Sequence, residues 1–289
     1  MFRPDSSGWR PLSGNAAGLP TLQASAQFGN GYANAYLLQS SDWTTPSFGP
    51  FGNNTDVPIP GNYEGRGRAQ LQAVWRPSTG GWYIMDSSGT FRSFNWGGQG
   101  NIPLPADYDG DGVDDLMVWD PSSGDWFLFP SGGYGPYGYY NNSYSVTQLG
   151  QAGDVPVPAD YDGDGQVDRA VWRPSEGNWY IKSSGAPPVQ WGQAGDIPVP
   201  GNYEGLGTDL AVFRPVEGKW YILNNSRTAG WWEGWGQAGD IPVPGDYDGD
   251  GKTDVAVFRP SNATWYWINS STGSGYYMAY GETGDIPIP

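Results

Sequence analysis

The chain of 289 residues contains no cysteine and no histidine. The absence of cysteine excludes disulfides and thiolate metal sites. The absence of histidine removes the commonest general base and the usual transition-metal ligand. No apolar run approaches the length of a membrane span, so we expect no membrane insertion. Positive charge is also scarce: 14 Lys and Arg against 30 Asp and Glu give a formal charge of −16, which argues against nucleic acid as a partner.

Turn-forming and aromatic residues are abundant instead. The 46 Gly and 26 Pro would suit a disordered chain, but 16 Trp, 19 Tyr and 10 Phe would not, because disordered chains are poor in aromatics. The glycines and prolines fall between short apolar runs, which is typical of turns between many short strands. No helical pattern of useful length is present, so the sequence predicts an all-β fold.

Three signals repeat along the chain at spacings of about 41 to 53 residues, the period of a four-stranded propeller blade. The first is an Asp/Asn-Ile/Val-Pro-x-Pro pentad, which begins at Asp56, Asn101, Asp154, Asp196, Asp240 and Asp285. The second is an apolar strand that ends in aromatic-Arg-Pro, at Phe2, Trp75, Trp172, Phe213 and Phe258, with the variant Trp119-Asp120-Pro121. The third is a Trp a few residues further on, at Trp9, Trp82, Trp126, Trp179, Trp220 and Trp265.

A degenerate copy begins at Phe28 and is followed by Trp43. Counting it gives seven strand units, so we predict a single domain, residues 1–289, that forms a seven-bladed β-propeller of four-stranded antiparallel blades. Six blades remain the alternative if the Phe28 stretch is an insertion. The phase of the termini predicts that Ile286–Pro289 pairs with Met1–Pro4 and closes the ring, which would remove two exposed sheet edges.

An acidic loop lies between the pentad and the following strand. In Asp246–Asp254 it places carboxylates at positions 1, 3, 5 and 9, which would repel one another unless a cation lay between them. Ca²⁺ accepts six to eight oxygen ligands in such a loop, where Gly251 allows the turn and the carbonyl of Lys252 is a further ligand. Position 12 holds Val257 instead of the glutamate of an EF-hand. The alternative is an acidic surface turn, which recurrence of the loop disfavours.

The loop, the Pro-x-Pro pentad and the Arg-Pro strand together resemble the FG-GAP/VCBS repeats of integrin α-subunit propellers, some fungal lectins and many secreted bacterial proteins. The resemblance covers nearly the whole chain and is weakest over residues 10–50. It implies about three Ca²⁺ sites, one in each complete loop. The implied ligands are Asp107, Asp109, Asp111 and Asp115; Asp160, Asp162, Asp164 and Asp168; and Asp246, Asp248, Asp250 and Asp254.

Three other copies of the loop depart from this pattern. Arg66 occupies a ligand position in the first, where it could replace the metal by pairing with Glu64. Leu206 occupies one in another, which is also one residue short, and the Phe28 loop has lost its acids. We expect none of them to hold Ca²⁺ well.

The repeated Trp and Arg-Pro positions are expected to pack between blades, with the Arg stacked on an aromatic ring or paired with an Asp. Aromatics outside the repeat suit ligand binding better, because an exposed ring can stack on the apolar face of a sugar. The alternative is that they only cover outer strands. These candidate ligand-binding residues are Tyr134, Tyr137, Tyr139, Tyr140, Trp231, Trp232, Tyr276 and Tyr277.

Three classes of function compete. The first is a glycan-binding or adhesive module, lectin-like, whose partners are glycans or cell-surface and matrix proteins. The second is a structural or protein-binding module of a larger extracellular assembly. The third, a polysaccharide lyase, is disfavoured because no acid/base pair stands apart from the repeat, so we expect no enzyme. Millimolar extracellular Ca²⁺ would fill sites of modest affinity, so we expect a secreted or cell-surface protein.

Overall fold

A computed structural model describes most of the chain beyond residue 51, together with two short strands near the N-terminus. The described residues are 4–5, 8–9, 52–53, 55–65, 73–86, 88–131, 144–182, 187–280 and 287. They contain strands and turns, and no helix among them is long and apolar enough to cross a membrane.

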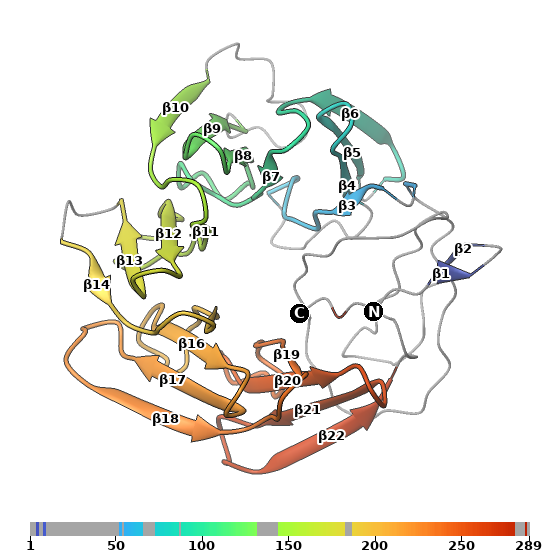
Figure 1. Ribbon diagram of the computed structural model, residues 1–289. Coiled ribbons are helices and arrows are strands. Elements are labelled where there is room, and N and C mark those ends of the chain that lie inside the picture. The colour runs from blue at the N-terminus through green and yellow to red at the C-terminus, as the bar shows by residue number, and fades with distance from the viewer. Residues whose placement is uncertain are drawn as a thin grey trace.

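Five four-stranded antiparallel sheets, here blades 1 to 5, follow one another around a central space (Figure 1). Blade 1 contains β3 (Val57–Pro58), β4 (Ala73–Arg76), β5 (Gly81–Met85) and β6 (Phe91–Asn95). Blade 2 contains β7 (Ile102–Pro103), β8 (Leu116–Asp120), β9 (Asp125–Phe129) and β10 (Ser145–Gln148). Blade 3 contains β11 (Val155–Pro156), β12 (Ala170–Arg173), β13 (Asn178–Ile181) and β14 (Val189–Gln190). Blade 4 contains β15 (Ile197–Pro198), β16 (Leu210–Arg214), β17 (Lys219–Leu223) and β18 (Gly230–Gly234). Blade 5 contains β19 (Ile241–Pro242), β20 (Val255–Arg259), β21 (Thr264–Ile268) and β22 (Gly275–Ala279).

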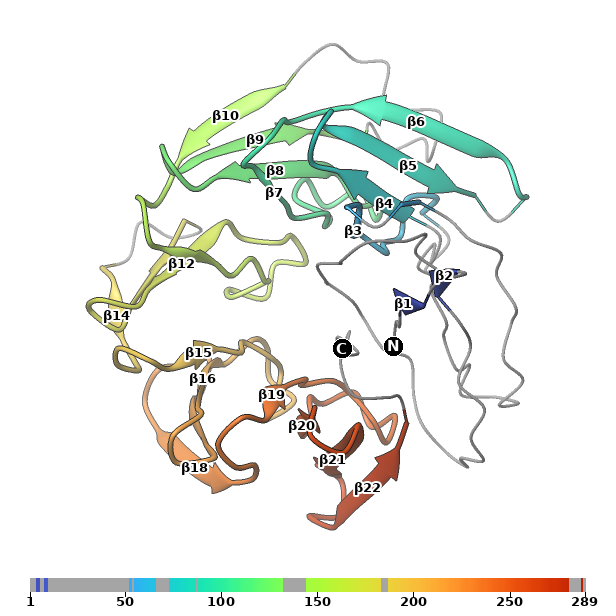
Figure 2. The same ribbon diagram turned by 45° about the vertical axis from the view of Figure 1, so that its right-hand side comes forward.

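Within each blade the strands pair in chain order, so the pentad strand lies toward the centre and the fourth strand lies outside (Figure 2). This order follows from the residues. Proline cannot donate to a ladder and is confined to sheet edges, which places the Pro-rich pentad at the inner edge. In blade 4 the pairing Pro198↔Val212 continues through Tyr221 to Trp232, so one register line crosses the sheet.

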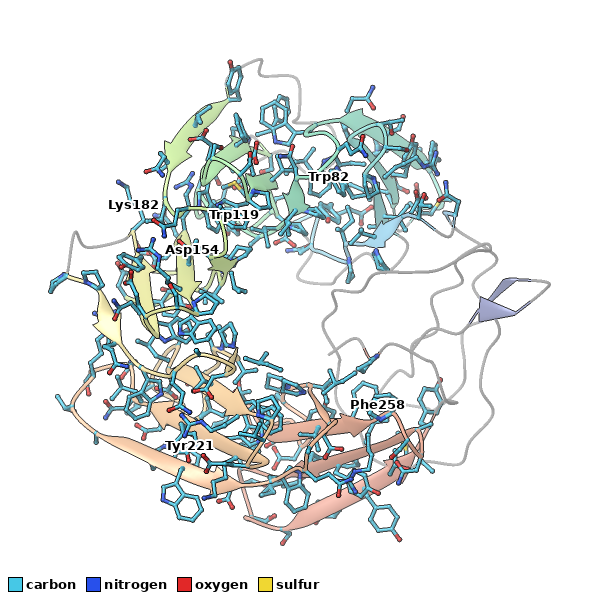
Figure 3. The ribbon with its side chains drawn as sticks, in the orientation of Figure 1. Trp82, Trp119, Asp154, Lys182, Tyr221 and Phe258 are labelled. Carbon is cyan, nitrogen blue, oxygen red and sulfur yellow. The ribbon has the colours of Figure 1, made fainter. Side chains whose placement is uncertain are left out.

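The core lies between neighbouring blades. Trp75 and Trp82 of blade 1 pack with Leu116 and Val118 of blade 2, and the same arrangement recurs around the ring, where side chains fill the spaces between sheets (Figure 3). An aromatic side chain buries about 150–250 Å², which corresponds to ~4–6 kcal/mol of transfer free energy as an upper estimate. The prediction that the repeated tryptophans pack between blades is confirmed for blades 1 to 4, where their clusters include residues of the next blade.

The predicted number of blades is wrong: the described residues form five, not seven or six. Among the described residues of the first strand unit, β1 (Pro4–Asp5) pairs with β2 (Gly8–Trp9) in a two-stranded sheet. The sequence of this unit is clipped, with eight residues between Trp9 and Gly18. The Phe28 unit and the predicted pairing of Ile286–Pro289 with Met1–Pro4 lie outside the described residues.

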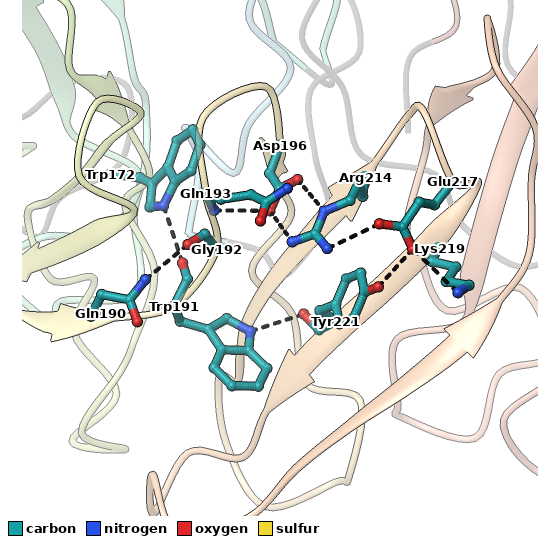
Figure 4. A network of polar contacts seen from close by, with 10 residues as sticks. All are labelled: Trp172, Gln190, Trp191, Gly192, Gln193, Asp196, Arg214, Glu217, Lys219 and Tyr221. Atoms are coloured by element: carbon teal, nitrogen blue, oxygen red, sulfur yellow. Dashed lines mark hydrogen bonds and ion pairs between the residues drawn. The ribbon is translucent and has the colours of Figure 1, made fainter.

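An Arg–Asp pair links the inner strand of a blade to its second strand. In blade 4, Arg214 Nε and Nη2 donate to the carboxylate of Asp196 at 2.8 and 3.0 Å, and the guanidinium lies 4.3 Å from the centre of the Tyr221 ring (Figure 4). The prediction that this Arg stacks on an aromatic ring or pairs with an Asp is confirmed on both counts. The same pairing occurs in blades 1, 3 and 5, in Arg76–Asp56, Arg173–Asp154 and Arg259–Asp240.

Blade 2 replaces this whole arrangement. Asn101 stands at the Asp position, Asp120 at the Arg position and Phe127 at the Tyr position. Asn101 still accepts a hydrogen bond from the amide of Gly98 at 2.9 Å, and Asp120 instead accepts bonds from the amide and hydroxyl of Ser122 at 2.8 and 2.7 Å. The turn geometry is therefore kept without the ion pair.

Two tryptophan indoles among the described residues donate hydrogen bonds from one blade to the next, Trp191 from blade 3 to blade 4 and Trp96 from blade 1 to blade 2. The carbonyl of Trp191 accepts bonds from Trp172 Nε1 at 3.3 Å and Trp179 Nε1 at 2.9 Å. Trp191 Nε1 then donates to the carbonyl of Tyr221 in the next blade at 3.0 Å (Figure 4). Trp96 makes the equivalent bond from blade 1 to Phe127 of blade 2.

Candidate metal loops and outer-strand aromatics

The loops between the first and second strands are numbered 1 to 5 with their blades. Loop 1 begins at Asn62, loop 2 is Asp107–Asp115, loop 3 is Asp160–Asp168, loop 4 is Asn202–Asp209 and loop 5 is Asp246–Asp254. Loop positions are counted from these first residues. A β-bridge between the residue before the loop and the final Asp closes the base of loops 2 to 5.

In each complete loop, the carboxylate at position 1 accepts hydrogen bonds from backbone amides of the same loop. In loop 5, Asp246 Oδ1 accepts from the amide of Gly249 at 2.7 Å, and its Oδ2 accepts from the amide of Gly251 at 2.9 Å. Asp107 and Asp160 make the corresponding bonds in loops 2 and 3. The glycine at position 6 has φ +86° in loop 5, a left-handed conformation that glycine adopts without strain.

Three carboxylates in each complete loop converge, with one oxygen of each lying within 4.8 Å of the others. The convergent groups are Asp107, Asp109 and Asp115; Asp160, Asp162 and Asp168; and Asp246, Asp248 and Asp250. The structure thus brings together three of the four predicted ligands in each loop. All donors are hard oxygens, the type that Ca²⁺ prefers, so the residues fit such an ion.

The electrostatics of these clusters favour a positive neighbour. The pKa of Asp115 is raised to about 7, because burial and the charges of Asp109 and Asp111 together outweigh the hydrogen bonds from the amides of Ser131 and Tyr108, which lower it. The same causes raise the pKa of Asp168 to about 6. A cation between the carboxylates would reverse this, because it stabilises their charged forms.

The remaining predicted ligands hold the loop itself. In loop 2, Asp111 Oδ2 accepts from the hydroxyl of Ser131 at 2.7 Å. In loop 5, Asp254 accepts from the amide of Tyr247 at 2.7 Å and from that of Ser270 at 2.6 Å, so both of its oxygens are engaged. In loop 3, Asp164 accepts from the amide of Gln166 at 2.8 Å.

The serines were not predicted, although the sequence carries a signal for them. The position-9 carboxylate accepts an amide hydrogen bond from a residue 16 positions later in three blades: Asp115 from Ser131, Asp209 from Asn225 and Asp254 from Ser270. This constant spacing joins the loop to the end of the third strand. The final Asp therefore has a structural role even in loop 4, which is one residue short and has Asn202 and Leu206 at two of the predicted ligand positions.

Loop 4 closes without the predicted ligand set. The amide of Gly207 donates to Asn202 Oδ1 at 3.2 Å, and the side-chain amide of Asn225 donates to the carbonyl of Leu206. A neutral amide thus satisfies the turn, and Leu206 itself is exposed. In loop 1, Arg66 and its predicted pairing with Glu64 lie outside the described residues.

The predicted ligand-binding aromatics of blades 4 and 5 occupy equivalent positions on the outer strands. Trp231 and Trp232 lie on β18, and Tyr276 and Tyr277 lie on β22, each pair opposite the third strand in the same register. All four side chains are exposed, with 61% of Trp232 and 75% of Tyr277 accessible. Tyr134, Tyr137, Tyr139 and Tyr140 belong to the long β9–β10 connection and lie outside the described residues.

A cavity of about 190 Å³ lies between blades 4 and 5 beside these aromatics. Trp231 and Glu233 line it from β18, since residues two apart on a strand share one face. Its other wall comes from blade 5, with Ile268, Asn269 and Ser270. Trp232 points to the other face, where its ring lies 5.0 Å from Lys219 Nζ.

Comparison with known proteins agrees with the blade architecture. Residues 238–278, which span most of blade 5, match the FG-GAP repeat family. This match and the propeller arrangement support an FG-GAP β-propeller, so the predicted resemblance is confirmed. No curated protein sequence matches the chain.

Solved structures show a similar fold. A crystal structure of BBS1N in complex with ARL6DN, soaked with mercury, superposes with a TM-score of 0.52 at 12% sequence identity, covering 95% of this chain and 86% of that chain. A second crystal of the same complex, soaked with lead, gives a TM-score of 0.48 at 13% identity over 88% of this chain and 81% of that chain. At such identity the likeness concerns the fold alone.

Proposed function

We propose that the chain is a protein-binding propeller module whose contact surface is the outer edge of blades 4 and 5. The observation that carries the proposal is the set of four exposed aromatic side chains at equivalent positions on β18 and β22. Large aromatics are enriched at protein interfaces because they bury much area at little entropic cost. The similar fold of BBS1N, crystallised in complex with ARL6DN, supports this class of function.

The two tyrosines of β22 pack against aromatic rings of the neighbouring strand in the absence of a partner. Tyr276 stacks on Trp267 with ring centres 5.9 Å apart, and Trp267 stacks on Tyr247 at 5.5 Å. Tyr277 lies 6.1 Å from Tyr266. Side chains already ordered in this way lose little conformational freedom on binding, which favours affinity.

The test compares Trp232→Ala and Tyr277→Ala with Phe91→Ala, a matched control on the outer strand of blade 1 that is 53% exposed. Partners captured by the full chain are quantified by mass spectrometry, and melting is followed in parallel. We expect the blade 4 and 5 variants to lose a defined partner while melting as the wild type does. Equal retention of every partner by all three variants would refute the proposed surface.

Glycan binding is a second candidate, because exposed aromatic rings flanked by polar groups also suit sugars. A glycan array run on the same variants separates the two. Retention of a glycan by the wild type and Phe91→Ala, and its loss in Trp232→Ala, would favour the lectin-like function over the protein-binding one.

We also propose that loops 2, 3 and 5 bind Ca²⁺, which would neutralise their converging carboxylates. Each ion that binds only the folded state adds about RT ln(1 + [Ca]/Kd), ~2.7 kcal/mol at a hundredfold excess. Excess chelator should therefore lower the melting temperature, and Asp246→Asn should reduce the shift. An unchanged melting curve would refute bound calcium.

Calcium sites of modest affinity would be filled at millimolar concentration, so we propose that the protein works outside the cell. Fractionation of the source cells, with detection of the chain in the medium or on the surface, tests this. Recovery from the cytosol alone would refute it.

A further inference from the structure

Loops 1 and 4 are bonded to the complete loops that follow them. In loop 4, the side-chain amide of Asn202 donates to the carbonyl of Gly251, at position 6 of loop 5, at 3.2 Å. The backbone amide of Asn202 donates to Thr253 Oγ1 at 3.0 Å, and its carbonyl accepts from the amide of Thr253 at 2.8 Å. Three hydrogen bonds thus join one residue of blade 4 to positions 6 and 8 of the next loop.

Asn62 repeats this arrangement between blades 1 and 2. Its side-chain amide donates to the carbonyl of Gly112 at 2.8 Å, and its backbone amide donates to Asp114 Oδ2 at 2.7 Å. Its carbonyl accepts from the amide of Asp114 at 3.0 Å. The same two positions of loop 2 are therefore held.

The residue before each Asn is adapted to the contact. A Cβ on Gly61 would lie 2.5 Å from Asp114 Oδ2, and one on Gly201 would lie 2.9 Å from Thr253 Oγ1. A larger residue at either position would displace the side-chain oxygen that accepts a hydrogen bond from the backbone amide of the following Asn. Loop 2 has Ala106 at this position, and its first residue makes one hydrogen bond to loop 3 instead of three.

Loop 2 provides an internal comparison because it begins with Asp107 instead of Asn. The carbonyl of Asp107 accepts a hydrogen bond from the amide of Val167, at position 8 of loop 3, at 2.8 Å. Its carboxylate accepts from its own loop, and Val167 has no side-chain acceptor to offer. Asn at position 1, Gly before it and a polar residue at position 8 of the next loop thus occur together.

We propose that Asn62 and Asn202 are positioning residues for the metal sites of loops 2 and 5. The peptide at position 6 is held on both sides: in loop 5 the amide of Gly251 donates to Asp246, and its carbonyl accepts from Asn202. This fixes the turn that leads to the carbonyl at position 7, the predicted backbone ligand from Lys252. Loops 1 and 4 thus complete the sites of their neighbours, an inference that rests on the proposed calcium function.

The test uses a full chain in which Asp107→Asn and Asp160→Asn leave loop 5 as the intact site. Ca²⁺ affinity is measured by calorimetry with and without Asn202→Ala. Loss of a hydrogen bond that orders the site should weaken binding about tenfold. Asn178→Ala, which removes a half-buried Asn bonded to Glu176 in blade 3, is the matched control and should leave the affinity unchanged.

Amide hydrogen exchange of residues 250–253, measured in excess chelator, gives a readout that needs no metal. We expect faster exchange in Asn202→Ala and in the Asn62→Ala equivalent over residues 111–114. Unchanged affinity together with unchanged exchange would overturn the proposal. Faster exchange in a protein whose wild type binds no Ca²⁺ would retain the positioning role and refute the calcium function instead.

Discussion

Replacing Gly177 with alanine should be far more harmful than its place in a surface turn suggests. Gly177 joins β12 to β13 with φ +68°, and its carbonyl accepts from the amide of Trp191 at 2.8 Å. A Cβ on Gly177 would lie 2.3 Å from the carbonyl oxygen of Gly192, which follows β14. Blades 1, 2 and 4 repeat the approach at Gly80, Gly124 and Gly218, at 2.1, 2.3 and 2.3 Å.

Two costs add in Gly177→Ala. The left-handed conformation costs alanine about 1–2 kcal/mol. Relief of the collision must move the backbone of Gly192 by about 1 Å, since carbon and oxygen rarely approach closer than ~3.3 Å, and such overpacking costs about 1–3 kcal/mol. The unfolding free energy should therefore fall by about 2–5 kcal/mol.

Gly195→Ala is the control that separates the two costs. Gly195 has φ +91°, yet nothing lies within 4 Å of its would-be Cβ, so it should lose only the conformational term. Urea unfolding followed by tryptophan fluorescence measures both variants. Equal destabilisation by the two substitutions would refute the argument that strand approach, and not backbone conformation, makes Gly177 necessary.

Two further predictions concern charge. Arg214→Ala removes the cation that pairs with the buried carboxylate of Asp196 and should lower the unfolding free energy by about 3–5 kcal/mol. Adding Asp196→Asn should recover part of this loss. A double variant no more stable than Arg214→Ala in urea unfolding would contradict the argument. For Asp86, burial raises the pKa, but bonds from Ser88, the amide of Thr90 and Arg92 outweigh it and lower the pKa to about 2. The stabilisation from Asp86 is thus present above the unfolded pKa of ~3.9 and is lost as pH falls toward 2. Asp86→Asn should therefore lower the unfolding free energy by about 1–2 kcal/mol at pH 7 and progressively less below pH 4. A difference between the urea midpoints of wild type and variant that stays constant with pH would contradict this pKa assignment.

The blade itself could be predicted because its rules are local. Proline marks the inner strand, the apolar strand that follows is buried on both faces, and each Trp stands two or more residues after its turn. Strand bounds such as Val255–Arg259 and Thr264–Ile268 follow the repeat closely. The number of blades could not be predicted in this way, because a local strand motif such as the one at Phe2 does not show whether four strands pair around it.

The candidate metal loops were predictable as clusters but not as bonded networks. The spacing predicted that Asp246, Asp248 and Asp250 lie together, but it could not show that both oxygens of Asp254 accept hydrogen bonds from backbone amides. Contacts between blades were also hidden. That Asn202 reaches Gly251, 49 residues away, depends on how two blades meet and not on either loop alone.

The replaced ion pair of blade 2 constrains the order in which such a blade can change during evolution. Loss of the Arg first would leave a buried carboxylate without its cation, whereas loss of the Asp first would leave a guanidinium that still reaches solvent. In blades 1, 3, 4 and 5 the Arg side chains are 14–28% exposed, and the side chains of their Asp partners are at most 1% exposed. The route through Asn at the inner position is therefore the passable one. Blade 2, with Asn101 and Asp120, is the end of such a route. In any other blade we therefore expect Asp→Asn at the inner position to be tolerated first, and to permit the later loss of the Arg.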